Sequence, residues 1–390
     1  MTELTGYRRA NGTWGVRNHL LVLPARTAAN RAAEEIADAV EGAVSVTHEW
    51  EGLPGDPDAG LVARTLTGFA ANPNVGAVLL VGIDDGDRPL ARAIAGRGQT
   101  VHLLAMAEHG GTAGAVAAGV GIAERLATSI AGWEREPMPL SALAVGLECG
   151  GSDALSGITA NPALGIASDR LVAAGATTML SEVPELVGAE EILAARAIND
   201  DVARRMVAVV HDFERSVEAL GVDIRGAQPT PGNIEGGLTT IEEKSLGAAK
   251  KAGNAPVTGV LGFAQAPARP GLYIMDTPGH DIEQMVGLVA GGCNLVAFTT
   301  GRGTPTGSPI APCLKISTNT AIFERMAGDI DLDAGRILDG SHTLASMGEA
   351  IYDALLRAAA GEPTASERRG NREFAIRRSG LRPPIGAQAA

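Results

Sequence analysis

Short, almost uninterrupted apolar runs recur along the chain, each followed by a segment with helical spacing, and this alternation limits the folds open to it. The clearest run is VGAVLLVGI at residues 75–83. A strand that is apolar on both faces is typical of a parallel sheet covered by helices on both sides. Parallel strands need crossover connections, which are right-handed and usually contain a helix. The pattern therefore predicts an α/β fold built from doubly wound, mainly parallel sheets.

The runs fall into two groups, which predict two consecutive α/β domains. For the first group we expect strands at 19–24, 44–48, 75–83 and 101–105, and helices at 29–40, 61–71, 87–95 and 112–133. The charged, proline-bearing stretch EREPMP at 134–139 then marks a boundary. For the second group we expect strands at 143–147, 177–180, 257–262, 272–275 and 295–298, and helices at 164–174, 189–220, 239–251, 282–290 and 337–356.

These expectations give a flavodoxin-like or Rossmann-like domain at 1–135 and a catalytic domain at 136–365. The helix near 239 has a capping-box pattern, Thr239-Thr-Ile-Glu242. Residues 366–390 are rich first in arginine and then in proline, so we expect a flexible tail or an arm on a neighbouring subunit.

Charge and cysteine content narrow the class of protein. The 390 residues include 32 Lys and Arg against 45 Asp and Glu, a net charge of −13. This balance argues against a nucleic-acid or anionic-membrane partner. Three cysteines without close spacing do not suggest a disulfide framework, and no apolar run is long enough to span a bilayer. We therefore expect a cytoplasmic protein.

Polar side chains follow two successive strands of the second group, in the stretch 271–317. The first strand is followed by Asp276, His280 and Asp281, and the second ends in Thr299, Thr300 and Arg302. Ligands of open α/β sheets bind where strands end and loops begin, so this stretch is predicted to form half of an active site. The structural alternative is that Thr277 or Asp281 caps the following helix and that His280 is an ordinary surface histidine.

A second polar loop, ECGGSD at 148–153, also follows a predicted strand, and SGITANP at 156–162 extends it. Two glycines allow a tight turn whose consecutive N–H groups face an anion, and the Cys149 thiolate is a suitable ligand for a borderline metal. The alternative is a glycine-rich turn with a buried cysteine. Because two polar loops occur in tandem, we favour the functional interpretation.

Several common motifs do not occur. We find no Walker lysine pattern and no G-x-G-x-x-G after a strand, which disfavours a nucleotide site. The H-E-x-x-H, paired C-x-x-C and G-x-S-x-G patterns are also missing, which weakens zinc and serine-hydrolase interpretations. Lys244 and Lys315 remain candidate bases or carboxylate partners, and Arg17 with His19 could reach a substrate anion or lie on the surface.

Together these motifs resemble the altronate/galactarate dehydratase family over nearly the whole chain. The matching segments are GYRR at 6–9, GVRNH at 15–19, ECGGSD, SGITANP, EEKSL at 242–246, MDTPGH at 275–280 and FTTGRGTPTGSP at 298–309. The resemblance implies a lyase that removes a β-leaving group, typically water, from a 2-hydroxy sugar acid such as altronate or galactarate to give a 2-keto-3-deoxy acid. It also implies a divalent metal, expected to be Fe²⁺. The large subunit of sulfolactate sulfo-lyase shares the architecture and eliminates sulfite instead.

Two departures from the family pattern matter. Family dehydratases carry a small SAF-type domain before the GYRR motif or receive it as a separate short subunit, so we expect a separately encoded SAF-domain partner and a homo-oligomer. The dehydratases also carry cysteines where this chain has residues 26–30, 48–52 and 83–85, which contain none. A non-catalytic sugar-acid-binding subunit without its metal is therefore an alternative to a dehydratase or a sulfo-lyase.

The expected mechanism is β-elimination that starts with removal of the proton α to a carboxylate. This proton is weakly acidic, so the ene-diolate needs a divalent metal or clustered cations. We assign catalysis to His280, Lys244 and Asp276, and metal binding to Cys149 and Cys293, with Asp276 as a further metal candidate. We assign substrate binding to Arg17, Asn18, Gly150, Gly151, Ser152, Asp153, Asn161, Thr300, Arg302 and Lys315.

Overall fold

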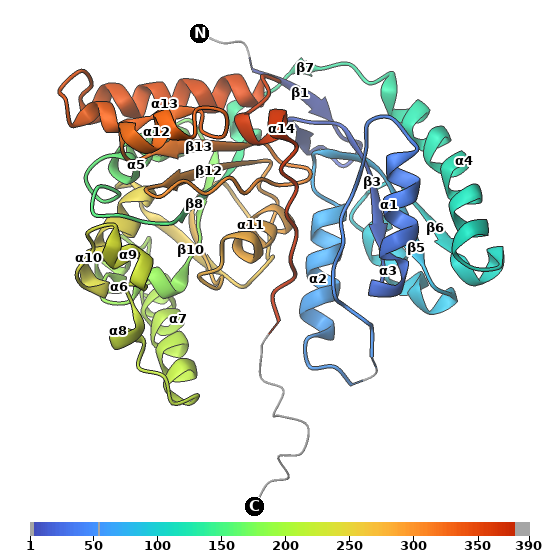
Figure 1. Cartoon of the computed structure of the whole chain (residues 1–390), viewed down its shortest axis with the longest axis horizontal. Helices are drawn as coiled ribbons and strands as arrows, with labels where there is room; N and C mark the ends of the chain where they lie inside the picture. Colours follow the sequence, from blue (N-terminus) through green and yellow to red (C-terminus); the bar gives the residue numbers. More distant parts are fainter. Residues whose placement is uncertain (1–3, 54, 379–390) are drawn as a thin grey trace, which may run out of the picture.

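The computed structural model describes residues 4–53 and 55–378 and has two α/β halves that lie side by side (Figure 1). Each half is built on a parallel sheet, which confirms the predicted fold class. A small antiparallel sheet joins them at one end. Within this described part, no helix is both long and apolar enough to cross a membrane.

The first half contains a four-stranded parallel sheet with the order β4-β3-β5-β6. Its strands are β3 (His19–Pro24), β4 (Ala43–Ser45), β5 (Val75–Gly82) and β6 (Val101–Ala105). Its helices are α1 (Asn30–Asp38), α2 (Ala59–Ala70), α3 (Arg88–Ala95) and α4 (Thr112–Ala131), with the 3-10 turns η1 (Thr27–Ala29), η2 (Asp85–Asp87) and η3 (Met106–His109). Helices α1 and α4 cover one face of the sheet, and α2 with α3 covers the other.

The second half contains a seven-stranded parallel sheet with the order β10-β11-β9-β8-β12-β13-β14. Its strands are β8 (Ala144–Gly150), β9 (Thr177–Leu180), β10 (Val257–Leu261), β11 (Gly271–Met275), β12 (Leu295–Thr300), β13 (Cys313–Ser317) and β14 (Leu332–Asp333). Its helices are α5 (Ala160–Ala173), α6 (Glu190–Ala194), α7 (Asp200–Glu218), α8 (Ile224–Ala227), α9 (Pro231–Glu235), α10 (Ile241–Ala249), α11 (Asp281–Ala290), α12 (Thr320–Arg325), α13 (Leu344–Ala359) and α14 (Ala365–Arg369), with η4 (Leu140–Ala142), η5 (Val183–Leu186), η6 (Lys250–Ala252) and η7 (Ala334–Ile337).

The alternation of side chains along β8 separates two sides of this sheet. Val145 and Leu147 pack into the core under α5 and α13. Gly146 faces the opposite side, where a Cβ would lie 2.9 Å from Leu288 of α11. Because successive side chains of a strand point to opposite faces, Cys149 belongs to the α5 side and Glu148 to the α11 side. The two neighbours therefore enter different environments.

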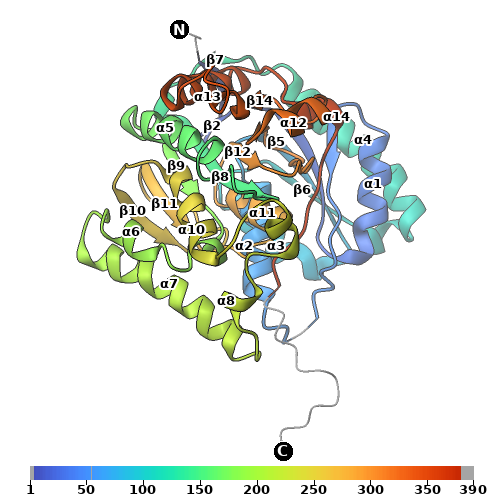
Figure 2. The ribbon, with the colours of Figure 1, turned by 60° about the vertical axis from the view of Figure 1, so that its left-hand side comes forward.

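The two halves share a hydrophobic core in which α2 packs on α11. Helix α11 lies between the second sheet and α2 (Figures 1 and 2). A Cβ on Gly68 would lie 2.2 Å from the Ala290 carbonyl oxygen, so only glycine permits this close approach of the two helices. The Asn72 amide donates to the Val289 and Cys293 carbonyl oxygens at 2.8 and 2.9 Å, which ties the halves together.

The C-terminal segment 371–378 crosses from the second half to the first, between the two sheets (Figure 1). Phe374 packs edge-on against Phe69 of α2 with a centroid distance of 4.8 Å. Arg378 donates to Asp56 at 2.8 Å and to Asp58 at 3.1 Å. The described part of the predicted tail is thus an arm packed on its own chain, and residues 379–390 lie outside the described residues.

Several elements differ from the sequence-based expectations, and β13, β14, α8, α9, α12 and α14 were not predicted at all. Residues 5–15 and 136–137 form an unpredicted antiparallel sheet of β1 (Thr5–Arg8), β2 (Trp14–Gly15) and β7 (Glu136–Pro137). The long helix predicted at 189–220 is broken between α6 and α7, because Asn199 accepts from the Asp201 and Val202 amides and starts a new helix. Thr240 rather than Thr239 caps α10, and α13 begins at Leu344 rather than near residue 337.

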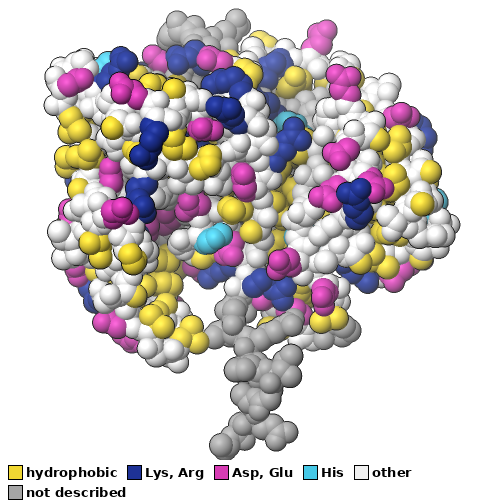
Figure 3. All heavy atoms as spheres, in the orientation of Figure 1, with side chains coloured by type: hydrophobic (Ala, Val, Ile, Leu, Met, Phe, Trp, Pro, Cys, Tyr) yellow, Lys and Arg dark blue, Asp and Glu magenta, His cyan; other side chains and the backbone are white. Residues whose placement is uncertain are grey.

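Charged side chains are interspersed by sign on the face shown in Figure 3. No continuous basic surface is visible there among the described residues. This distribution agrees with the acidic overall balance of −13.

Candidate active site

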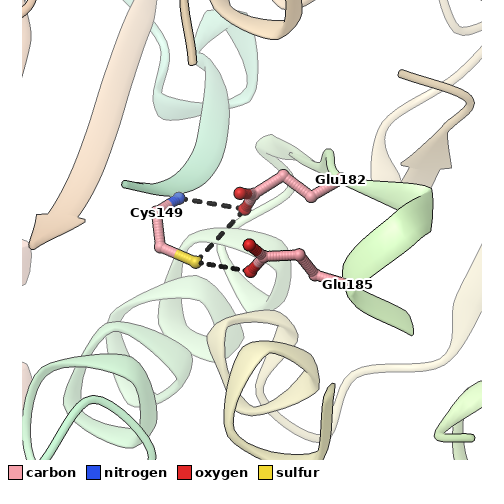
Figure 4. A group of neighbouring side chains, drawn as sticks. All are labelled: Cys149, Glu182 and Glu185. Atoms are coloured by element: carbon pink, nitrogen blue, oxygen red, sulfur yellow. Dashed lines mark hydrogen bonds between the residues drawn. The ribbon is translucent and has the colours of Figure 1, made fainter. Parts of the chain in front are cut away.

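Cys149 lies at the carboxyl edge of the second sheet and contacts two glutamates (Figure 4). Cys149 is the next-to-last residue of β8. Glu182 and Glu185 belong to the turn that follows β9. The Cys149 sulfur lies 3.3 Å from Glu182 Oε2 and 3.2 Å from Glu185 Oε2, and the Cys149 amide donates to Glu182 Oε2 at 3.0 Å. A thiol and two carboxyl groups are thus in contact with one another in the interior of the protein.

Two lysines complete this group, which we call the Cys149 cluster: Cys149, Glu182, Glu185, Lys244 and Lys251. The Lys251 ammonium donates to Cys149 Sγ at 2.7 Å and also to Glu182. Lys244 Nζ lies 2.8 Å from Glu185 Oε1. The Lys251 side chain is fully buried, with no exposed surface. Buried charges are stable only when paired, and each lysine of the cluster has a carboxylate partner.

The backbone of Glu182 is strained. Its φ of 72° lies in the left-handed region, which non-glycine residues rarely adopt. Such a conformation costs on the order of 1–3 kcal/mol and persists where surrounding contacts enforce it. Thr277 supplies one such contact, because its hydroxyl oxygen accepts a hydrogen bond from the Glu182 amide at 2.7 Å. The segment 275–280 therefore holds the glutamate turn in place.

Burial and neighbouring charges set the protonation of the cluster. Burial raises the pKa of the Cys149 thiol well above its ordinary value, and Glu182 and Glu185 raise it further. Burial, together with the neighbouring Glu185, raises the pKa of Glu182 to about 7. Burial opposes the charged form of Lys251, but Cys149, Glu182 and Glu185 outweigh this effect and raise its pKa. At neutral pH the thiol is therefore protonated and the lysine is charged.

On the α11 side of β8, Glu148 lies among other buried charges. Burial raises the pKa of Glu148 well above its ordinary value, and Asp281 adds to the shift. Neither carboxyl oxygen of Glu148 has a hydrogen-bond partner among the described residues. A Cβ on Gly150 would lie 2.3 Å from Asp281 Oδ2, so glycine is required where the Asp281 carboxylate packs on β8. Gln284 connects the two sides by donating to Glu182 Oε1 at 3.3 Å.

A cavity of about 210 Å³ adjoins the Cys149 cluster. Lys244 and Ser152 line it and also touch the cluster, since the Ser152 hydroxyl donates to Cys149 Sγ at 3.6 Å. The other lining residues are Asp153, Ala154, Ser156, Gly157, Ile158, Asn161, Leu238, Glu243, Leu246, Gly247 and Lys250. The lining is a mixture of apolar and polar residues, and a space of this size can take only a small molecule.

Most residues predicted from the ECGGSD and SGITANP loops meet at this edge. Gly150 and Gly151 end β8, and Ser152, Asp153, Asn161 and Lys244 line the cavity. Thr300 and Arg302 lie at the same edge, because the Arg302 amide donates to the Gly151 carbonyl oxygen at 3.0 Å. The Arg302 side chain pairs with Glu235 at 3.1 Å, whereas the Thr300 hydroxyl accepts from the Gly303 and Thr304 amides and supports the loop.

The structure places the residues after β11 near the glutamate turn but outside the cavity lining. His280 is exposed and occupies the N-cap position of α11, without a capping hydrogen bond from its side chain. Gly279, next to it, lies on Pro184 of η5, where a Cβ would be 3.5 Å away. Asp276 forms an ion pair with Arg377 of the C-terminal segment at 3.4 Å, so its described contact is with that segment.

Four predicted site residues lie elsewhere. Cys293 precedes β12 at the amino edge of the sheet, opposite Cys149, in an apolar cluster where burial raises its thiol pKa. Arg17 and Asn18 precede β3. Arg17 pairs with Glu367 at 2.7 Å, and the Asn18 amide donates to the Ile130 carbonyl oxygen. Lys315 is fully buried within β13, 3.4 Å from the centroid of the Phe298 ring, and does not line the cavity.

Sequence reasoning missed Glu182, Glu185 and Lys251. Glu182 and Glu185 follow a strand that was correctly predicted at 177–180, so the strand-end rule applied to the other loops would have found them. Lys251 follows the exposed Lys250, and a lysine pair at a helix end is typical of a solvated surface. Its sequence context carries no sign of burial.

The metal implied by the family resemblance does not fit this arrangement. Cys149, Glu182 and Glu185 offer ligand atoms that all lie within 4.8 Å of one another. Among the described residues, this is the one group of three or more possible metal ligands. However, the Lys251 ammonium contacts both Cys149 and Glu182, and Lys244 pairs with Glu185. The positions of a cation are thus occupied by lysines.

Comparison with known proteins identifies the family. Residues 6–131 match the second domain of D-galactarate dehydratase/altronate hydrolase, and residues 140–381 match the C-terminal domain of D-galactarate/altronate dehydratase. The chain is 38% identical to (2R)-sulfolactate sulfo-lyase subunit beta of Chromohalobacter salexigens, over 96% of each chain. It is 37% identical to altronate dehydratase of Escherichia coli, over 97% of this chain and 78% of the relative, and 36% identical to that of Bacillus subtilis, over 96% and 78%. The chain therefore belongs to the D-galactarate/altronate dehydratase family.

Proposed function

We propose that this chain eliminates water from a 2-hydroxy sugar acid of the altronate or galactarate class and forms a 2-keto-3-deoxy acid. Family membership supports a sugar-acid lyase, and relatives that match most of this chain are named altronate dehydratase. The observation that carries the proposal is the position of Lys244, which lines the small cavity and is paired with the buried Glu185.

Lys244 gives the cavity a fixed positive charge. Burial opposes this charge, but the neighbouring Glu185 outweighs it and raises the pKa of Lys244. Removing the proton α to a carboxylate produces an ene-diolate, whose extra negative charge must be stabilised where it develops. A charged group in a water-poor site is worth more than the same group in water. Lys244 is therefore suited to bind the substrate carboxylate and to stabilise the ene-diolate.

The proposed steps use groups at this edge. The substrate carboxylate binds Lys244 and the turn at Gly150 and Gly151. A base takes the proton from C2, and the C3–O bond then breaks as C2=C3 forms. His280 is the predicted base, and because it lies beside the glutamate turn rather than in the cavity lining, the substrate would have to extend from the cavity towards α11 to meet it. The departing hydroxyl receives a proton from an acid at this edge and leaves as water, while Lys244 keeps its charge, and the enol product converts to the 2-keto acid. General acid–base groups of this kind contribute about 10²–10⁴-fold each.

A second candidate reaction is elimination of sulfite from sulfolactate. It is favoured by the match to the sulfo-lyase subunit, which spans 96% of both chains, whereas the dehydratases are longer and are covered to 78%. The same C2 proton is removed in this reaction, and the C3–S bond breaks in place of C3–O.

One assay separates these reactions. The purified chain is incubated with altronate, galactarate and (2R)-sulfolactate, and 2-keto acid and sulfite are measured. It is run alone and with the SAF-domain subunit expected from the resemblance. Keto acid without sulfite from a sugar acid supports the dehydratase. Sulfite from sulfolactate alone supports the sulfo-lyase, and binding without turnover of any acid would support the non-catalytic alternative.

A further inference from the structure

Lys251 is a buried cation that the chain itself supplies to the Cys149 cluster. Its side chain has no exposed surface and lies in η6, which packs on α5. Its ammonium donates to Cys149 Sγ at 2.7 Å and to Glu182. It therefore contacts two of the three groups that could ligate a metal here.

Lys244 contacts Glu185, the third of the possible metal ligands. Its ammonium lies 2.8 Å from Glu185 Oε1, and Gln228 Oε1 and Asn233 Oδ1 accept from it at 3.0 and 3.1 Å. Two charged lysines thus face two carboxylates and one thiol. Each of the three candidate metal ligands therefore already contacts an ammonium group.

A divalent ion placed among the same ligands would lie next to the Lys251 ammonium. Like charges this close together in a buried site repel each other strongly, so the ammonium would oppose the binding of a divalent ion there. Lys251 has no exposed surface through which to leave the site. Metal binding would therefore require the lysine to lose its proton or to abandon both partners.

We propose that the Cys149 cluster is a metal-free reaction centre in which Lys251 occupies the place of a divalent ion and Lys244 provides the cation that meets a 2-hydroxy acid. This deepens the proposed function and rests on it for the role of Lys244. Lys244 touches the cavity and is the catalytic cation. Lys251 does not line the cavity and is a positioning residue that balances the charge of Glu182 and holds Cys149.

The first test is a metal measurement that does not depend on activity. Wild-type protein is reconstituted with Fe²⁺ or Co²⁺ under reducing conditions, desalted and measured for bound metal, and the cobalt sample is examined for the thiolate-to-cobalt absorption band. We expect substoichiometric metal and no band. Stoichiometric metal with a band that the Cys149→Ser variant removes would overturn the proposal.

The second test removes the competing cation. Lys251→Ala should bind Co²⁺ at least about 100-fold more tightly than wild type, with a thiolate band, because the repulsion is removed and the three ligands are freed. Lys250→Ala, the adjacent exposed lysine of the same turn, is the matched control and should gain no affinity. Equal cobalt affinity in wild type and Lys251→Ala would count against the proposal. If Lys251→Ala does not fold, the wild-type measurement alone decides.

Turnover then separates this proposal from the proposed function. Wild-type activity on the accepted acid should be unchanged by a chelator and by added Fe²⁺. Activity lost on chelation and restored by iron would contradict the metal-free centre but leave the reaction intact. If no acid is turned over in either state, the proposed function fails, whereas the metal measurements still decide the inference.

Discussion

At the scale of single residues, Glu182 has an unusual environment for a glutamate. It combines a left-handed backbone, almost complete burial and contacts with a thiol and an ammonium. Each feature is unfavourable alone. They persist because Thr277 binds the Glu182 amide and because Cys149 and Lys251 contact the Glu182 carboxyl group. An outlier of this kind at a strand end is a sound reason to suspect function.

Replacing Glu182 by Gln should be strongly destabilising. The substitution keeps the side-chain shape but removes the negative charge that pairs with Lys251, and breaking a buried ion pair costs about 3–5 kcal/mol. Chemical denaturation at pH 8 would measure this loss. Glu349→Gln is the control, because its pair with Arg170 is exposed and should change stability by less than about 1 kcal/mol. Equal stability of the two variants would mean that the buried pair contributes nothing.

Replacing His280 by Ala should lower kcat by about 10²–10⁴-fold, because the proposed base is removed. His280 is exposed, so thermal unfolding should hardly change. His102→Ala, an exposed histidine in β6, should retain normal turnover and serves as the control. Turnover by His280→Ala within a few-fold of wild type would remove this histidine from the mechanism, and the base would have to be sought among the cavity residues.

Of the predicted site residues, Cys149 and Lys244 lie together at the carboxyl edge, whereas Cys293 and Arg17 lie elsewhere, for a reason that can be stated. Residues that follow a parallel strand lie at the carboxyl edge, where ligands bind, whereas residues that precede a strand lie at the opposite edge. Cys293 precedes β12 and Arg17 precedes β3. Their positions relative to the predicted strands were sufficient to exclude them. The burial of Lys251, in contrast, depends on the packing of η6 against α5 and has no local pattern.

At the scale of elements, apolar runs predicted most of the long strands and the parallel character of both sheets, because a buried strand requires continuous apolar residues; β13 was not predicted. The breaks were harder to predict. The segment 189–220 has helical spacing throughout, yet the Ile198 amide bonds to the Val257 carbonyl oxygen and Asn199 starts a new helix. The antiparallel sheet of β1, β2 and β7 joins segments more than a hundred residues apart, with strands of two to four residues. Strands this short carry no periodic pattern.

The C-terminal arm provides a prediction at this scale. Phe374 is half-buried against Phe69, so Phe374→Ala should lower the free energy of unfolding by about 1–3 kcal/mol through lost apolar contact and lost aromatic pairing. Denaturant titration followed by intrinsic fluorescence would measure it. If the variant unfolds at the same denaturant concentration as wild type, the arm is detached in solution. Limited proteolysis after Arg372 would give an independent check.

At the scale of the whole molecule, the shared core between α2 and α11 makes the two halves dependent on each other. Buried residues of both halves form one cluster, including Leu66 and Phe69 with Val286 and Val289. The Asn72 and Asn74 amides bond to carbonyl oxygens of the other half at 2.8–2.9 Å. These bonds lie at the amino edge of the second sheet, so the sheet that carries the Cys149 cluster at its other edge is supported by both halves.

Stability should fall in mild acid, in part because of His19. Burial, together with the nearby Arg17, lowers the pKa of His19 to about 4, with Glu367 opposing and Arg372 and Arg9 adding to the shift. In the unfolded chain its pKa is about 6.5. The unfolded state therefore binds the extra proton first, so stability is fully present above about pH 6.5 and is lost as pH falls towards 4.

Comparing wild type with His19→Gln isolates this contribution. The stability difference between them should shift by about 1–3 kcal/mol in favour of the variant between pH 7 and pH 4. Denaturant titrations across this range would measure it. His48, whose pKa is also lowered by burial, stays in both proteins and cancels. A difference that is constant with pH would show that His19 is accessible in the folded state.

The proposed replacement of a metal ion by Lys251 in the Cys149 cluster has a consequence for the cell. The charge of a lysine side chain is part of the polypeptide from synthesis onwards. Unlike a metal ion, it cannot be removed by a chelator, replaced by another metal or oxidised. Enzymes that depend on bound iron lose activity when iron is scarce or when peroxide oxidises it. If the centre is metal-free as proposed, the turnover of this chain should not fall when iron is scarce.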